Sequence, residues 1–289
     1  MSPIPNTLIT PTLVSRQALG FWQESQVLCG LFNRAYSGEF GGGRGDTVTI
    51  RKQASLTASV FNRGTGVTVQ DVVESTVTVQ VTDLYDVSVQ VTQEQWDFDV
   101  ENFGWQVVEP AGRALARQAE QLVAAQMAAG GGGPISITAA TPVPAFIDAR
   151  KELNAAEVPL DGRFVVVGTD VAAALLSSDQ FLKANEAGDS LALRSAQIGR
   201  MLGMDVYESV VVDPKDAFVC HPDALTFVSI VPQIARGTSD GSVGTYDGLG
   251  LRTVFGYDMN KKQDLVSFDA YYEVAPLRGD SAYRRLAIP

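Results

Sequence analysis

Apolar positions in the first part of the chain pass from a helical to a strand-like spacing. Leucine, valine, phenylalanine and tryptophan recur at approximately helical intervals over residues 13–32. Thr10 followed by Pro11 is typical of a helix start, and Gly20 interrupts the pattern at a point where this helix could break. Residues 47–50 then alternate polar and apolar, which predicts a half-buried strand.

Alternation resumes at residues 76–82 and 87–91, which are rich in valine and threonine. These residues predict long strands in a two-stranded ribbon. Such a ribbon is only marginally stable alone, because it buries little apolar surface. The pattern therefore predicts a partner surface that covers it.

The strongest helical pattern lies between Pro110 and Ala129 and predicts a rod of about 30 Å. Glycines 130–133, followed by Pro134, end this helix and predict a hinge or linker. The expected apolar face carries Ala111, Leu115, Ala119 and Leu122, and the expected polar face carries Arg113, Arg117, Glu120 and Gln121.

The second half of the chain is predicted to mix helices and strands. The expected helices are 143–156 and 172–176, and the expected strands are 164–167, 218–220, 249–257 and 265–274. We predict two lobes, the first of which carries the ribbon and an N-terminal arm.

Composition narrows the classes of function. The 289 residues are 45% hydrophobic and 19% charged, which excludes a disordered chain, and a mean hydropathy of +0.06 indicates surfaces that partners bury. A net charge of −11 argues against a nucleic-acid-binding protein. The sequence shows no signal peptide and no apolar run long enough to cross a membrane, so we expect a protein made and used inside a cell.

Candidate chemical motifs do not form a catalytic set. Cys220 and His221 are adjacent on a predicted strand, where side chains point to opposite faces and cannot form a nucleophile–base pair. The glycines of 41–45 and 64–66 lack the spacing of phosphate-binding or dinucleotide-binding loops. Asp97, Asp99 and Asp269 are isolated acids. We predict no catalytic, cofactor-binding or metal-binding residues and no cofactor.

Six stretches, in this order and spacing over nearly the whole chain, resemble the major capsid proteins of tailed bacteriophages. They are residues 31–36, 45–52, 110–116, 162–167, 198–209 and 250–258. The type fold of that family is the HK-ninety-seven capsid, and the chain looks closest to the subgroup of the phage P-twenty-two coat protein.

The resemblance implies an α+β tailed-phage capsid fold. Its expected parts are an N-terminal arm (1–46), an extended β-hairpin loop (47–82), a peripheral domain (83–145) with a long spine helix at about 110–129, an axial domain (146–248), and return strands with a C-terminal tail (249–289). The chain has no obvious inserted β-domain or long helical leader, so a separate scaffolding protein is expected. No lysine, asparagine and glutamate set for covalent cross-linking can be matched.

The function implied is a major capsid protein that assembles as pentamers and hexamers into an icosahedral shell around packaged double-stranded DNA. It would assemble in the host cytoplasm, with scaffolding, portal and decoration proteins as partners and no membrane. Rival functions are a tail tube subunit and a hydrolase or transferase at the Val167–Asp170 turn.

The resemblance also implies roles for particular residues. Val77, Val79 and Val81 of the extended loop are expected to lie against the next subunit's spine helix, in which Arg113, Leu115, Arg117 and Leu122 stand. Replacing Val79 with aspartate is then expected to leave the subunit folded and to block assembly. The glycines expected to act as hinges are Gly41, Gly42, Gly43, Gly130, Gly131, Gly132 and Gly133.

Overall fold

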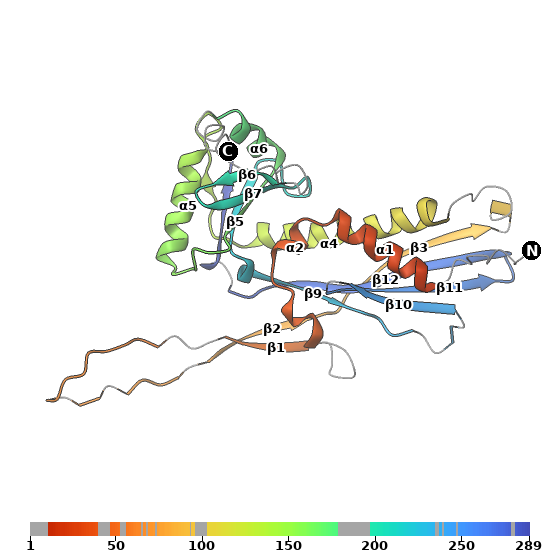
Figure 1. Cartoon of the computed structure of the whole chain (residues 1–289), viewed down its shortest axis with the longest axis horizontal. Coiled ribbons are helices and arrows are strands. Elements are labelled where there is room, and N and C mark those ends of the chain that lie inside the picture. The colour runs from red at the N-terminus through yellow and green to blue at the C-terminus, as the bar shows by residue number, and fades with distance from the viewer. Residues whose placement is uncertain are drawn as a thin grey trace, which may run out of the picture.

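The structure, a computed structural model, has three parts: a long platform of sheet and helices, a compact second lobe, and a thin hairpin that projects from the platform (Figure 1). It describes residues 11–39, 47–52, 56–64, 66–67, 69–72, 74–92, 94–95, 103–178, 197–234, 237–238, 240–246, 248–278 and 281–289. The helical elements are α1 (Pro11–Ser25), α2 (Leu28–Leu31), η1 (Ala35–Glu39), η2 (Gly104–Val108), α4 (Glu109–Ala129), α5 (Val143–Ala155), α6 (Thr169–Leu176) and η4 (Pro222–Ala224). The strands are β1 (Thr47–Lys52), β2 (Ser75–Gln80), β3 (Leu84–Thr92), β4 (Ile135–Ser136), β5 (Phe164–Val167), β6 (Gln197–Met201), β7 (Met204–Glu208), β8 (Asp216–Cys220), β9 (Leu225–Ile230), β10 (Asp240–Tyr246), β11 (Leu249–Asp258), β12 (Gln263–Pro276) and β13 (Tyr283–Ala287).

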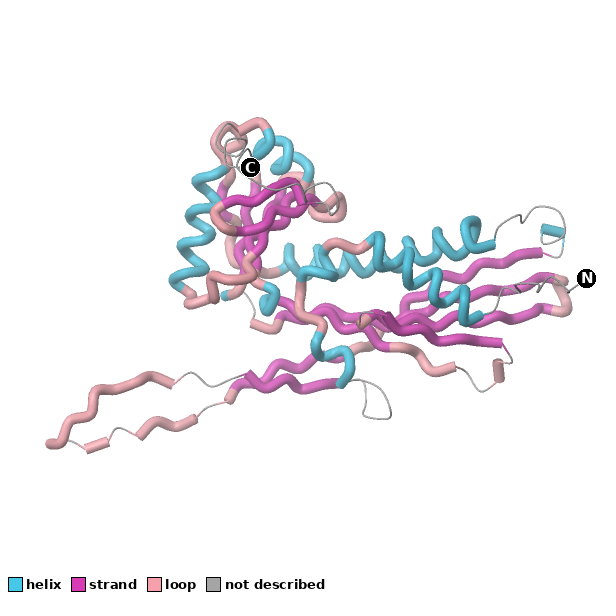
Figure 2. The backbone as a smooth tube through the Cα atoms, viewed as in Figure 1, coloured by secondary structure: helices cyan, strands magenta, loops and turns pink. Residues whose placement is uncertain are grey.

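The platform is an antiparallel sheet in the order β10-β11-β12-β3, with β9 paired to the far end of β12. α1 and α4 lie along one face of this sheet (Figure 2). Phe268 and Tyr272 of β12 are fully buried, and the Tyr272 ring meets Trp22 of α1 edge to face at a centroid distance of 5.7 Å. The core of the platform therefore lies between the sheet and these two helices.

The second lobe is a mixed sheet in the order β4-β13-β8-β5-β7-β6. All residues of its central strand β5 are buried, which explains why Phe164–Val167 is apolar throughout rather than alternating. α5 and α6 belong to the same lobe (Figure 1). Phe32 and Phe164 pack edge to face at 5.3 Å, and this contact joins the N-terminal segment to the lobe within one continuous core.

The helix expected at 110–129 is confirmed as α4, and the strands expected at 47–50 and 76–82 correspond to β1 and β2. The ribbon expected from residues 76–82 and 87–91 is wrong, because β2 pairs with β1, whereas β3 pairs with β12 in the platform. The break expected at Gly20 is wrong, because α1 runs through it and ends at Ser25. Gly20 is exposed, and an added Cβ atom would meet no atom within 4 Å. A glycine on a solvated helix face costs only about 1 kcal/mol relative to alanine, which the packing of the rest of α1 outweighs.

Strand pairing crosses the boundaries expected from the sequence between residues 146–248 and 249–289. β9 and β10 pair with β12 and β11 in the platform, and β13 pairs with β8 and β4 in the second lobe. The chain therefore passes between the two lobes more often than a division into consecutive segments suggests. Hydrophobic periodicity marks where a strand lies along the sequence, whereas its sheet depends on long-range pairing.

Candidate functional site

The projecting hairpin is built on a short antiparallel ladder of β1 and β2, in which Val48 pairs with Val79 and Ile50 with Val77. Successive residues of a strand face opposite sides, so this register places every second apolar residue on one side of the ladder. Figure 1 shows β1 and β2 at the root of the hairpin, beside the platform. The ladder thus sets the direction in which the rest of the hairpin extends.

A second, small apolar core, separate from the main one, fixes this root to the platform. Val79 is 1% exposed and Val81 6% exposed, while Val77 is half-buried. The residues that cover them come from the same chain and include Ile50, Val228, Ala275 and Leu277. We call this cluster the hairpin anchor.

The anchor differs from the sequence-based expectation that Val77, Val79 and Val81 lie against a neighbouring subunit's helix. Their own chain buries them, because Val228 of β9 and Ala275 near the end of β12 pack in the same apolar cluster. A role for these valines in assembly stays a prediction, and it would now be indirect, through the placement of the hairpin.

Beyond the ladder, the hairpin displays apolar side chains to solvent. Val60 is 97% exposed and Val69 86% exposed, and further large exposed side chains are Leu56, Phe61, Val67 and Val72. The two arms are held side by side by hydrogen bonds between the backbone of Thr57 and the side-chain amide of Gln70, one of them at 3.0 Å. We call residues 56–72 the hairpin tip. A run of exposed apolar residues of this kind is typical of a surface that another protein covers.

The long helix α4 follows directly on the π-helical turn η2, so the helical path begins before Pro110. Of the residues expected to matter on this helix, Leu115 is 2% exposed, and Leu122 is half-buried beside the main core. Arg113 is exposed and forms an ion pair of 2.8 Å with Glu109, one turn earlier, and Arg117 is exposed. The two arginines thus lie on the solvent-facing side of α4, where the spacing of polar residues along the helix predicts them.

Glu120 was expected on the polar face of α4, and this expectation is wrong: the residue is only 3% exposed. Its carboxylate accepts hydrogen bonds from the backbone N–H groups of Val27, Leu28 and Cys29 at 2.9, 2.9 and 3.0 Å. These are the free N–H groups at the start of α2, which otherwise has no side-chain cap. Burial raises the pKa of Glu120, and the hydrogen bonds from the three N–H groups offset part of this rise because they stabilise the carboxylate. Glu120 therefore ties the N-terminal helices to α4.

The glycines expected to act as hinges differ in their surroundings. Gly41, Gly42 and Gly43 lie outside the described residues. Gly130 ends α4, and Gly131 and Gly132 have φ angles of +80° and +73°, a region that favours glycine. Gly131 is buried against Tyr283, and its carbonyl accepts a hydrogen bond from the Arg285 N–H. Gly131 is therefore packed against the rest of the second lobe, and the role of glycines 130–133 as a hinge stays a prediction.

We expect Gly131→Ala to destabilise the protein by about 1–3 kcal/mol. A Cβ atom there would lie 2.9 Å from Cε2 of Tyr283 on a backbone with positive φ. Gly133→Ala is the matched control, because a Cβ at Gly133 meets no atom within 4 Å, and its effect should stay within about 0.5 kcal/mol. Urea unfolding of both variants measures the difference, and equal midpoints would contradict the packing argument.

Cys220 and His221 do not act on each other. Burial raises the pKa of the Cys220 thiol, which keeps it protonated and unreactive. His221 stands at the start of η4, where its Nδ1 atom accepts a hydrogen bond from the Asp223 N–H at 3.2 Å. Burial lowers the pKa of His221, in agreement with an unprotonated Nδ1. The pair has a structural role at the junction of β8 and β9.

The expected acids fall into two groups. Asp97 and Asp99 lie outside the described residues. Asp269 is 4% exposed and forms an ion pair with Arg252 of the neighbouring strand. Among the residues that the structure describes, histidine, cysteine and acidic side chains form no group of three or more suited to a metal ion. Within that same part of the chain, no helix has the length and apolar character needed to span a membrane.

Comparison with known proteins identifies both a family and a fold. The family model described as phage capsid protein matches residues 73–283. A solved structure from Mycobacterium phage Che8 has 21% sequence identity, covers 90% of each chain and gives a TM-score of 0.66. The mature capsid of bacteriophage PhiM1 has 15% identity, covers 85% of this chain and 83% of its own, and gives a TM-score of 0.61. A virus-like particle from Pyrococcus furiosus covers 94% of this chain and 97% of its own, at 13% identity and a TM-score of 0.57. No curated protein matches the chain.

Proposed function

Because this chain belongs to the phage capsid protein family, we propose that its hairpin tip is the element that links neighbouring subunits in the shell. The chain is a major capsid protein, a structural component of the icosahedral virion shell and not an enzyme. Its subunits associate with one another into capsomers. The proposal concerns which surface of the chain performs that association.

The observation that carries the proposal is the contrast between the two ends of the hairpin. At the root, Val79 is buried by its own chain, whereas at the tip Val60 and Val69 are almost fully exposed. Burying apolar surface is worth roughly 25 cal/mol per Å², so a tip covered by another subunit would favour association. The anchor holds the ladder in one direction, so ordering the tip on a neighbour costs less entropy than ordering a free loop.

The remaining parts of the shell are proposed on the strength of the family. The second lobe would stand at the axes of pentamers and hexamers, as an axial domain, and the platform would form the peripheral domain. The net charge of −11 suits a wall that encloses double-stranded DNA without binding it tightly. A separate scaffolding protein, a portal, decoration proteins, assembly in the host cytoplasm and kinship with the P-twenty-two coat subgroup belong to the same proposal.

The test is electron microscopy and sedimentation of the purified protein, expressed with and without a candidate scaffolding protein. We expect closed shells of uniform diameter from the wild type and unassembled, folded subunits from the double variant Val60→Asp, Val69→Asp, because each aspartate would place a charge in an apolar contact. The double variant Val60→Ile, Val69→Ile keeps the tip apolar and should retain shells. Wild-type-sized shells from the aspartate variant would contradict the proposed role of the tip.

A further inference from the structure

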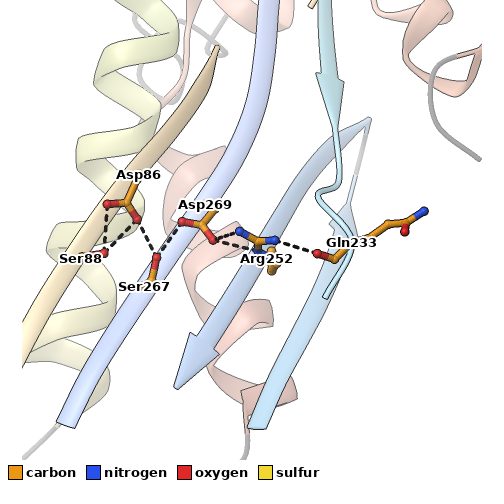
Figure 3. A network of polar contacts seen from close by, with 6 residues as sticks. All are labelled: Asp86, Ser88, Gln233, Arg252, Ser267 and Asp269. Carbon is orange, nitrogen blue, oxygen red and sulfur yellow. Dashed lines mark hydrogen bonds and ion pairs between the residues drawn. The ribbon is translucent and has the colours of Figure 1, made fainter. Parts of the chain in front are cut away.

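A network of polar side chains crosses three adjacent strands of the platform (Figure 3). Asp86 and Ser88 come from β3, Ser267 and Asp269 from β12, and Arg252 from β11. In the ladder, Asp269 pairs directly with both Arg252 and Asp86. The buried neighbours on β12 point toward α1 and α4, so this network lies on the opposite face of the sheet.

Arg252 forms hydrogen bonds with only one of the two carboxylates, that of Asp269. Nε and Nη2 of Arg252 donate to Oδ2 of Asp269 at 2.8 and 2.5 Å, and Nη1 donates to the backbone carbonyl of Gln233 at 2.7 Å. Asp86 is held instead by serine hydroxyls, with Ser88 Oγ 3.0 Å from both of its carboxylate oxygens. Two carboxylates thus share one face of the sheet with a single cation among the described charged groups that face them.

The Ser267 hydroxyl stands between the two carboxylates. Its Oγ atom lies 2.6 Å from Oδ1 of Asp86 and 2.7 Å from Oδ1 of Asp269. A hydroxyl carries one proton, so it can donate to only one of these oxygens. The other contact is as short as an O–H···O hydrogen bond, and two oxygens that both lack a proton would repel each other at that distance. A carboxyl group must therefore supply the second proton.

We propose that Asp86 and Asp269 hold one proton between them through Ser267, and that this proton forms a pH-sensitive clasp between β3 and β12. With the proton in place, Arg252 balances the one remaining negative charge. Without it, two carboxylates face each other across a strand pair, an arrangement that destabilises a sheet. Because β3 begins only four residues after β2 ends, loosening the clasp would also loosen the strand that leads out of the hairpin.

The pKa shifts agree with this geometry. Burial raises the pKa of Asp269 above its ordinary value of 3.8, and the contact with Asp86 raises it further. Asp86 is an exposed residue. The part of it that is desolvated would raise its pKa, but the contact with Asp269 and the hydrogen bonds from Ser267 and Ser88 outweigh this and lower that pKa. A folded-state pKa raised above the unfolded value means that the folded protein binds more protons there. The contribution of Asp269 is therefore complete at pH values below about 4 and is lost as the pH rises through its folded-state pKa. The lowered pKa of Asp86 acts in the opposite sense, and its contribution is lost only as the pH falls below about 4.

Hydrogen exchange of the full-length subunit in dilute solution, followed by mass spectrometry at several pH values above 4, tests the clasp. After correction for intrinsic exchange, protection of peptides from 84–92 and 263–271 should fall with rising pH, by up to about tenfold per pH unit in the window. In Asp86→Asn the decline should become much smaller, because the amide carries no charge and can donate to Ser267 at any pH, which leaves only burial to raise the pKa of Asp269.

Two further variants keep the clasp test decisive. Asp240→Asn, an exposed acid on β10 of the same sheet, should keep the wild-type decline. Asp269→Asn should abolish the decline, because it removes the carboxyl group whose pKa is raised, and it takes the place of Asp86→Asn if that variant fails to fold. The clasp is overturned if wild-type protection shows no pH dependence or if Asp86→Asn and Asp240→Asn decline alike. Because the measurement concerns one subunit, its result is independent of whether the hairpin tip links subunits in a shell.

Discussion

Val79→Asp is expected to destabilise the subunit by about 3–5 kcal/mol and to release the hairpin from the platform. Val79 is 1% exposed in the hairpin anchor, and an aspartate there would either bury an unpaired carboxylate or pull β2 away from its cover. Urea unfolding measures the loss of stability, and limited proteolysis reports whether the hairpin has become accessible. This expectation replaces the one drawn from the sequence, in which the variant subunit stays folded.

Val69→Asp is the matched control for this prediction. The substitution is the same and lies in the same hairpin, but Val69 is 86% exposed, so the change in stability should stay within about 0.5 kcal/mol. The two variants thus separate the anchor from the tip: one should lose stability, and the other should keep its fold. Similar urea midpoints for both would mean that the anchor contributes little to the folded subunit.

The contrast between Val79 and Val69 shows how far the sequence can be interpreted. Alternation of valine and threonine predicts the strand β2 correctly, because the period of two follows from local backbone geometry. It also predicts that one face needs an apolar cover. It does not identify that cover, since Val228 and Ala275 lie far away in the sequence and reach β2 only through the pairing of β9 with β12.

The parts of the site that depend on charge were harder to predict for a related reason. Glu120 follows the polar spacing of α4, and acidic residues are seldom buried, so a solvated position was the natural expectation. Only the tertiary approach of α2 places three N–H groups around it. Asp269 gave no signal either, because its partners Asp86 and Arg252 are adjacent only in the folded sheet. Family resemblance supplied the fold, but not these contacts.

Glu120→Ala is expected to cost about 3–5 kcal/mol and to loosen the N-terminal helices from α4. The alanine leaves the backbone N–H groups of Val27, Leu28 and Cys29 without the acceptor that they have in the wild type. Buried donors that lose a charged acceptor each cost about 1–3 kcal/mol, and partial hydration of the opened joint should reduce the sum. Urea unfolding gives the total loss, and hydrogen exchange of peptides from residues 26–34 locates it.

Glu120→Gln keeps the side-chain volume and separates the loss of the hydrogen bonds from the loss of the negative charge. Val27 and Cys29 both donate to Oε1, whereas Leu28 donates to Oε2. A glutamine that places its carbonyl oxygen at the Oε1 position keeps two of these bonds, while its amide nitrogen faces the Leu28 N–H and can accept nothing from it. The variant should therefore retain more than half of the stability that alanine loses. If glutamine and alanine instead destabilise equally, the negative charge, rather than the number of hydrogen bonds, is what holds α2 against α4.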